Sequence, residues 1–196
     1  ARTDLLEVLE GLDPTDWDKP TLCAGWRVRD VVAHLAEAPE VKARKLFPRV
    51  LRARGDVDKV RDEAARVSGS REIEGILAQY RSNLECTRLP SGSSIDAMLV
   101  DTVIHSLDIC RPNWWELDLP ADRARRVLSS VVQRGDVVGA KERADGLHFD
   151  TTDIDWRCGC GDHVRGPAPV MLLALAGRPV CDQLTGDGVS TLADRA

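Results

Sequence analysis

The sequence predicts a mainly α-helical protein: a helical bundle over residues 1–145, followed by a small α/β segment over residues 146–196. Three observations predict this class. Apolar residues recur at helical spacing through the first two thirds of the 196-residue chain. The composition changes near Gly146, where short apolar runs alternate with turn residues. Hydrophobic residues make up 43% of the chain, which is enough to form a core without disulfides.

Five segments each carry one apolar stripe at the spacing of an α-helix: residues 5–12, 26–38, 70–84, 95–109 and 119–132. Gly11 marks the end of the first stripe. Asp13 followed by Pro14 is typical of a helix start and opens a short turn that Pro20 closes. Because each helix has one apolar face to bury, we expect these helices to pack as a bundle.

The segment after Gly146 carries the signals of a small mixed structure. Three strands and one helix are expected, at residues 147–149, at 154–156, from Val164 and over 167–176. The helix should end at Gly177, since glycine is typical just beyond a helix end. The remainder, residues 182–196, is rich in turn-forming residues.

The charge balance argues against nucleic-acid binding. The net charge is −5, with 27 Lys and Arg against 32 Asp and Glu, and aromatic residues are only 4% of the chain. A nucleic-acid-binding protein would show a basic stripe with aromatic residues for stacking. No apolar run approaches the roughly 20 residues of a membrane-spanning helix, and no signal-like segment opens the chain. We therefore expect a cytoplasmic protein that binds neither nucleic acid nor membranes.

The cysteines indicate a reduced environment. Six are present, and four of them are scattered along the chain. Cys158 and Cys160 are two residues apart, which is not the C-x-x-C spacing of zinc knuckles or thioredoxin-like motifs. We interpret all six as reduced thiols. The alternative for Cys158 and Cys160 is an accessory soft-metal or redox site.

The helix expected over residues 95–109 is apolar around most of its circumference, with one narrow polar strip. Ser94, Asp101, His105 and Asp108 form this strip. Asp101 and His105 are four residues apart, so their side chains lie on one face of the helix. A carboxylate and an imidazole at this spacing can chelate one cation. The alternative is that the strip simply faces water, and this helix alone does not decide between them.

A metal site would need a third ligand from another segment. The chain has four histidines, and His34 lies at the edge of the apolar face of the helix expected over residues 26–38. A single histidine at such an edge is usually part of the core boundary. Because Arg27 and Asp30 on the same flank are polar, the spacing does not decide its role.

Three motifs resemble those of the mycothiol-dependent maleylpyruvate isomerase family, which belongs to the DinB-like superfamily of metal-binding bundles. The first is WDKPTLCAGWRVRDVVAHL at residues 17–35, and the second is LVDTVIHSLDI at residues 99–109. The third, LALAGRP at residues 173–179 followed by LTGDG at 184–188, is similar to the tail of the shorter members. The resemblance covers nearly the whole chain.

This resemblance implies a DinB-like four-helix bundle that holds one divalent metal ion, most often Zn²⁺, with Ni²⁺ or Fe²⁺ as alternatives. The implied ligands are His34 from the second helix and Asp101 and His105 from the fourth. The characterised isomerase has Glu where this chain has Asp101, whose side chain is one methylene shorter. Three protein ligands leave a tetrahedral ion with an open position, which is typical of catalytic zinc sites. The family fills it with the sulfur of a small thiol, mycothiol.

The resemblance therefore implies a thiol-dependent isomerase or transferase acting on a small electrophilic or carboxylate substrate. Asp108 is expected either to accept the free N–H of His105 or to lie in solvent. Arg178 is expected either to anchor a substrate carboxylate as a catalytic residue or to cap a helix C-terminus. Cys23 is interpreted as a small buried hydrophobe.

Two other functions stay open from the sequence. A metal-dependent hydrolase would place water in the open position. A non-enzymatic binding or regulatory module would use the metal, or no metal, for structure alone; the absence of an H-x-x-x-C-x-x-C spacing weighs against the related zinc-binding regulators of sigma factors.

Overall fold

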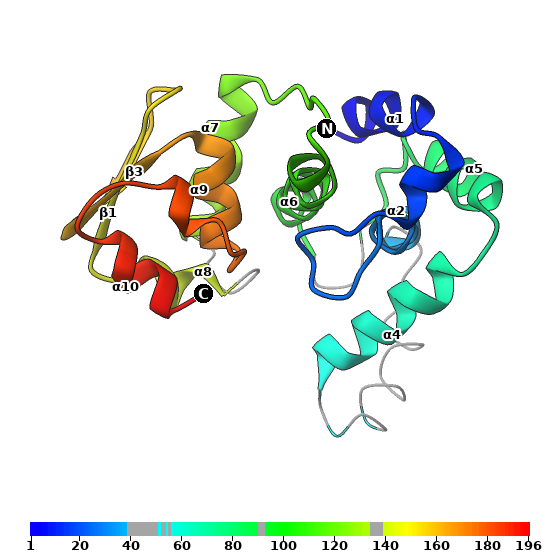
Figure 1. Ribbon diagram of the computed structural model, residues 1–196, viewed down its shortest axis with the longest axis horizontal. Coiled ribbons are helices and arrows are strands. Elements are labelled where there is room, and N and C mark those ends of the chain that lie inside the picture. The colour runs from blue at the N-terminus through cyan, green and yellow to red at the C-terminus, as the bar shows by residue number, and fades with distance from the viewer. Residues whose placement is uncertain (39–50, 52–53, 55, 90–92, 134–138) are drawn as a thin grey trace. The chain divides into compact units, whose positions relative to one another are not determined.

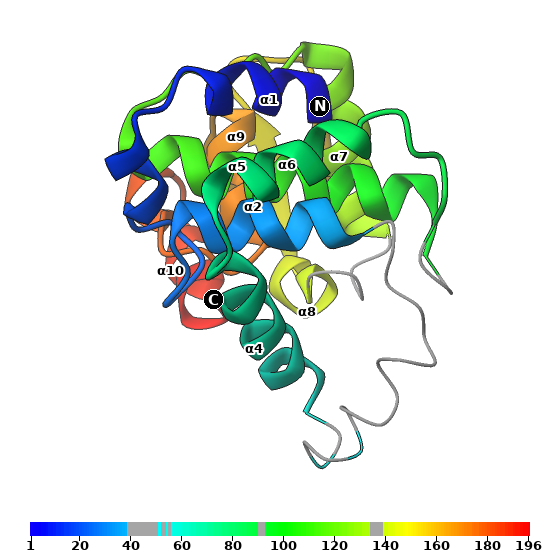
Figure 2. The same cartoon turned by 90° about the vertical axis from the view of Figure 1, so that its right-hand side faces the viewer.

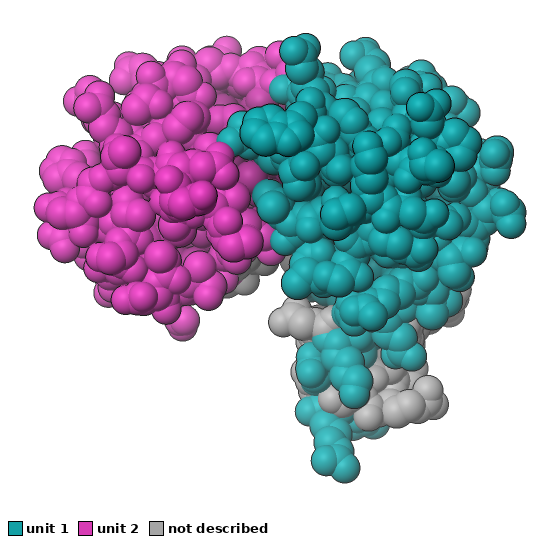
Figure 3. All heavy atoms as spheres, viewed as in Figure 1, with its two compact units in different colours: residues 1–98, 108–117 teal, residues 99–107, 118–196 magenta. Residues whose placement is uncertain are grey.

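The computed structural model describes residues 1–38, 51, 54, 56–89, 93–133 and 139–196. The chain divides into two compact units, shown in Figure 3. The first comprises residues 1–98 and 108–117, and the second comprises residues 99–107 and 118–196. The long helix α6 (Ile95–Asn113) therefore contributes to both units, with both of its ends in the first.

Besides the ends of α6, the first unit contains four α-helices and one 3₁₀ helix within the described residues. These are α1 (Arg2–Glu10), η1 (Pro14–Asp18), α2 (Val28–Glu37), α4 (Val57–Gly69) and α5 (Ile73–Ser82). Helix α2 packs against α4, α5 and η1. Figure 2 shows α1, α2 and α5 alongside one another, while α4 runs away from them. Helices α1, α2 and α5 lie together because their apolar stripes are buried in one cluster.

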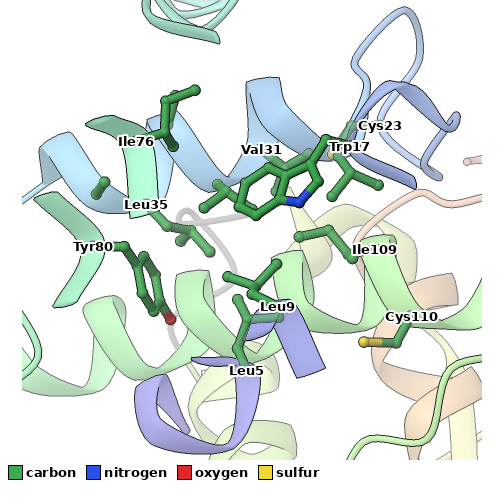
Figure 4. Packing of buried hydrophobic residues seen from close by; sticks show 14 residues of the cluster. Leu5, Leu9, Trp17, Cys23, Val31, Leu35, Ile76, Tyr80, Ile109 and Cys110 are labelled. Atoms are coloured by element: carbon green, nitrogen blue, oxygen red, sulfur yellow. The ribbon is translucent and has the colours of Figure 1, made fainter. Parts of the chain in front are cut away.

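The core of the first unit is built from these predicted stripes. Leu5 and Leu9 from α1 meet side chains of α2 and α5, and Ile109 joins them from α6 (Figure 4). Each of these three side chains is no more than 1% exposed. Trp17 of η1 packs into the same cluster, so the short turn after α1 is part of the core.

Local signals begin and end the helices as the sequence predicts. The backbone N–H of Asp13 donates to Oδ2 of Asp16 across 2.9 Å, which forms half of a capping box at η1. Ser94 accepts a hydrogen bond from the backbone N–H of Ala97 at the start of α6. The expected end of α6 at residue 109 is too early, because the helix continues to Asn113 and ends at Trp114 in a left-handed conformation.

The second unit holds a small sheet covered by helices. Its elements, besides the middle of α6, are α7 (Ala121–Gln133), α8 (Ala140–Ala144), β1 (Leu147–Thr151), β2 (Arg157–Gly159), β3 (Asp162–Gly166), α9 (Ala168–Leu175), η3 (Cys181–Gln183) and α10 (Val189–Asp194). The strand order is β2-β1-β3, with β2 antiparallel and β3 parallel to β1. Helix α9 packs against β3 and α7 (Figure 1). Its side chains are almost all buried, which explains the continuous apolar run from residue 168.

One expected strand needs correction, and three helices were not expected. The strand expected at residues 154–156 is wrong, because the hydroxyl of Thr151 donates to the carbonyls of Ile154 and Trp156 and closes a tight turn there. Strand β2 begins only at Arg157. Helices α4, α8 and α10 are not among the expected ones. The division of the chain into two domains near residue 145 stays a prediction. Helices α7 and α8 precede that position in the sequence, and both pack against α9, which follows it.

None of the six cysteines, all in described parts of the chain, forms a disulfide. Among the described residues, no helix is both long enough and apolar enough to cross a membrane.

Candidate metal centre

The polar strip of α6 is only partly open to solvent. The Nε2 atom of His105 lies 3.6 Å from Oδ1 of Asp101, one helical turn away. The Asp101 side chain is 38% exposed, whereas the His105 side chain is 13% exposed. Apolar residues on the rest of this stretch are buried, namely Val100, Val103, Ile104 and Leu107. A carboxylate and an imidazole therefore share one face of a helix whose other sides are mostly buried.

His34 lies near the C-terminal end of α2, and its ring centroid is 5.4 Å from that of Trp26. The indole N–H of Trp26 donates to Oδ1 of Asp62 on α4 across 2.7 Å. At the start of α2, the buried carboxylate of Asp30 accepts from the backbone N–H and the guanidinium of Arg27. The hydrogen bond to Asp30 raises the pKa of Arg27, so the guanidinium stays charged. These contacts fix α2 and the loop that precedes it.

The three predicted ligand residues come together. One ligand atom each from His34, Asp101 and His105 lies within 4.8 Å of the others. Two imidazoles and one carboxylate form a donor set that suits Zn²⁺, and Ni²⁺ or Fe²⁺ also bind such sets. All three residues are partly buried, so a cation held there would be only partly hydrated. The residues present therefore fit a divalent metal ion.

A second group of side chains shares His105. Ligand atoms of Cys23, His105 and Asp108 also lie within 4.8 Å of one another. Asp108 is 0% exposed, which excludes the expectation that it lies in solvent. The thiol of Cys23 donates to Oδ2 of Asp108 across 3.0 Å. The interpretation of Cys23 as a plain buried hydrophobe is therefore incomplete: the residue is 8% exposed, but its thiol contacts a carboxylate. The one feature of the sequence that points to a role for Cys23 is its position within the first motif, residues 17–35.

Arg178 lies just beyond the end of α9. Its Nη1 atom donates to the carbonyl oxygen of Ala176 across 3.3 Å, which is the contact of a helix C-terminal cap. Arg143 donates to the carbonyl of Leu175 at the same helix end. Burial, and then the positive charge of Arg178, lower the pKa of Arg143. The capping contact is therefore present, and a role for Arg178 toward substrate stays a prediction.

The cysteines at residues 158 and 160 lie on β2 and in the turn after it. Within the part of the chain that the structure describes, neither belongs to a group of three potential metal ligands. The other two histidines, His148 and His163, face each other across β1 and β3 with ring centroids 4.7 Å apart.

Comparisons with known proteins agree with the motifs. A family model described as the mycothiol maleylpyruvate isomerase N-terminal domain matches residues 1–88. The crystal structure of the mycothiol-dependent maleylpyruvate isomerase is similar over 95% of this chain and 88% of that chain, with 14% identity and a TM-score of 0.62. A mutant of that isomerase gives the same TM-score at 13% identity. No curated protein matches the chain. The family model confirms the resemblance over the first 88 residues, and the solved structures confirm the fold class, a mainly helical bundle with a small α/β appendage.

Proposed function

We propose that this chain, which is similar to the mycothiol-dependent maleylpyruvate isomerase in fold and in its first 88 residues, is a cytoplasmic, metal-dependent enzyme that works with a low-molecular-weight thiol. Its reaction is an isomerisation or a transfer on a small electrophilic substrate. The observation that carries the proposal is the approach of His34, Asp101 and His105 to within 4.8 Å. The matches to the mycothiol-dependent isomerase support the thiol part of the proposal, and the donor set of these three side chains supports the metal part.

The three side chains would hold one divalent ion, for which we favour Zn²⁺. Two neutral imidazoles and one carboxylate leave a divalent ion with a net charge of +1, so the site favours an anionic fourth ligand. When bound, the metal supplies the positive charge that keeps a thiol in its ionised, nucleophilic form near neutral pH. Asp101 is one methylene shorter than the Glu of the characterised isomerase, so the ion would lie closer to α6 or bind through a water molecule.

The thiol that we propose is mycothiol. A thiolate matches the charge and the softness that a zinc site with an open position favours. It is also a better nucleophile than hydroxide toward an electron-poor double bond. We propose Arg178 as the anchor for a substrate carboxylate, since a guanidinium binds carboxylates in two parallel hydrogen bonds. In this role its guanidinium would give up the hydrogen bond to the carbonyl of Ala176 and bind the substrate carboxylate instead.

Metal content tests the ligand set directly. Elemental analysis of the purified protein should find about one divalent ion per chain. His105→Ala should lose the ion, because it removes a ligand from α6. The matched control is His163→Ala, which removes a histidine of β3 whose ring lies beside that of His148. Equal metal in wild type and His105→Ala would overturn the assignment.

Calorimetric titration tests the thiol. The zinc-loaded protein is titrated with mycothiol and then with S-methyl mycothiol, which cannot ionise. Mycothiol should bind and release protons, because a thiol must lose its proton to become the ligand. The S-methyl compound should bind far more weakly. If both bind equally, or neither binds, the site is better explained as a hydrolase or a regulatory metal centre.

A further inference from the structure

We propose that Cys23 is a positioning residue for the metal centre: its thiol orients the carboxylate of Asp108, and that carboxylate orients the ring of His105. The proposal rests on the proposed function, since it gives Cys23 a role toward a metal ligand. It goes beyond that function by assigning a task to a cysteine that is not itself a ligand. The contacts that carry it involve the loop before α2 and the C-terminal half of α6.

The burial of Asp108 is the first step. A carboxylate that is 0% exposed is costly to desolvate unless its oxygens accept hydrogen bonds. The thiol of Cys23 donates to Oδ2 across 3.0 Å, and the thiol is itself nearly buried. Two apolar side chains of similar size would fill the same space without the cost of desolvating a carboxylate, so packing alone does not account for this polar pair.

The orientation of His105 is the second step. Its Nε2 atom lies 3.6 Å from Oδ1 of Asp101, the other candidate ligand on α6. In the proposed site Nε2 binds the metal, and Nδ1 is the ring nitrogen that Asp108 orients. Asp108 follows His105 by three residues on the same helix, and their candidate ligand atoms lie within 4.8 Å. A carboxylate beside the second nitrogen of a metal-binding histidine fixes its tautomer and its ring angle.

The anchoring of Cys23 is the third step. The loop that carries it is fastened to α6 by the backbone N–H of Leu22, which donates to the carbonyl of Asp108 across 3.0 Å. Within the loop, the backbone N–H of Cys23 donates to the hydroxyl of Thr21, and the backbone N–H of Trp26 donates to the carbonyl of Cys23. These bonds hold the backbone on both sides of Cys23 and so keep its thiol within hydrogen-bond distance of Asp108.

Two substitutions at Cys23 separate positioning from packing. Cys23→Ala removes the donor, and Cys23→Ser keeps a donor of similar size. Zn²⁺ affinity, measured by competition with a chromophoric chelator, should fall about 10-fold or more in Cys23→Ala, the scale for partners of metal ligands. Cys23→Ser should recover most of that loss. Cys110→Ala is the control, because it truncates another buried cysteine of the same core without removing a donor to Asp108. Its affinity should be unchanged.

A second readout does not depend on metal. In the metal-free protein, long-range ¹H–¹⁵N spectra of the His105 ring should show one tautomer in wild type and Cys23→Ser, and a mixture in Cys23→Ala. An unchanged tautomer in Cys23→Ala overturns the proposal. If the tautomer responds but wild type binds no metal, the positioning role stands and the proposed function fails.

Cobalt substitution tests whether Cys23 is a ligand instead. The Co²⁺ protein should show no intense sulfur-to-cobalt charge-transfer band, because the thiol is bonded to Asp108. Such a band, lost in Cys23→Ser, would overturn the positioning role and make Cys23 a direct metal ligand.

Discussion

Two cysteines of the first unit, Cys86 and Cys110, lie in very different surroundings. A hydrogen bond from the side chain of Arg88 is the main reason that the pKa of the Cys86 thiol is lowered. Burial raises the pKa of Cys110 to about 12. The thiolate is the reactive form of cysteine. Cys86 therefore becomes reactive at a pH below the ordinary thiol pKa of 9.0, whereas Cys110 stays protonated at pH values well above it.

We therefore expect iodoacetamide at pH 8 to alkylate Cys86 well before Cys110. Mass spectrometry of peptides from a time course measures both rates in one sample. In urea the two cysteines should react at similar rates, since burial is lost and the contact with Arg88 is broken. Faster labelling of Cys110 in the folded protein would contradict the burial of that side chain.

At the scale of elements, the packing of α4 on α2 depends on one glycine. A Cβ atom at Gly69 would lie 2.8 Å from the Cα of Asp30 and closer still to its Oδ1. Asp30 cannot move aside easily, because it is buried and bonded to Arg27. Gly69→Ala should therefore lower the free energy of unfolding by about 1–3 kcal/mol, the usual cost of overpacking. Urea denaturation measures the change.

The control for Gly69 is Gly75, which lies inside α5. A Cβ atom there meets nothing within 4 Å. Gly75→Ala should stabilise the protein by about 0.5–1 kcal/mol, because alanine is the better helix former. Equal effects at both positions would mean that α4 and α2 do not pack as closely as the structure indicates.

Helix α9 depends on a cap from outside the helix. Its first backbone N–H, at Ala168, donates to Oδ1 of Asp153 across 2.8 Å, although the two residues are 15 positions apart. Asp153→Ala should cost about 1 kcal/mol, as for other N-terminal caps, because the N–H loses its acceptor. Asp155→Ala removes a carboxylate from the same turn and should change stability by less than about 0.5 kcal/mol. Thermal unfolding compares the two variants, and equal losses would refute the capping role.

At the scale of the whole molecule, the fold should survive removal of the metal. The core of the first unit consists of apolar side chains from α1, α2, α5 and α6, and none of them needs an ion to pack. After treatment with a chelator, the far-ultraviolet circular dichroism should keep its helical signal. The bound ion should still raise the melting temperature. A ligand whose free concentration is 100 times its Kd stabilises the folded state by about 2.7 kcal/mol. Collapse to coil on chelation would instead identify a structural metal.

The local pattern of the sequence determined most of the helices. A helical stripe is a repeat over a few residues, so it predicts α1, α2, α5, α6 and α7 within a few residues of their ends. The apolar run over residues 167–176 predicts α9 in the same local way. The motif resemblance identified His34, Asp101 and His105 as a candidate set before their positions were known. Spacing alone suggested only Asp101 with His105, because local periodicity does not relate residues on different helices.

The tertiary structure alone decided the features that depend on distant contacts. Helix α4 buries only Val60 and Ala65 among its described apolar side chains, so its stripe is too weak to predict. The start of β2 is set by the turn after Thr151 and by pairing with β1. The thiol of Cys23 contacts the carboxylate of Asp108 across 85 positions of sequence. Periodicity describes which face a side chain occupies, whereas a hydrogen bond between distant segments exists only once packing has brought them together.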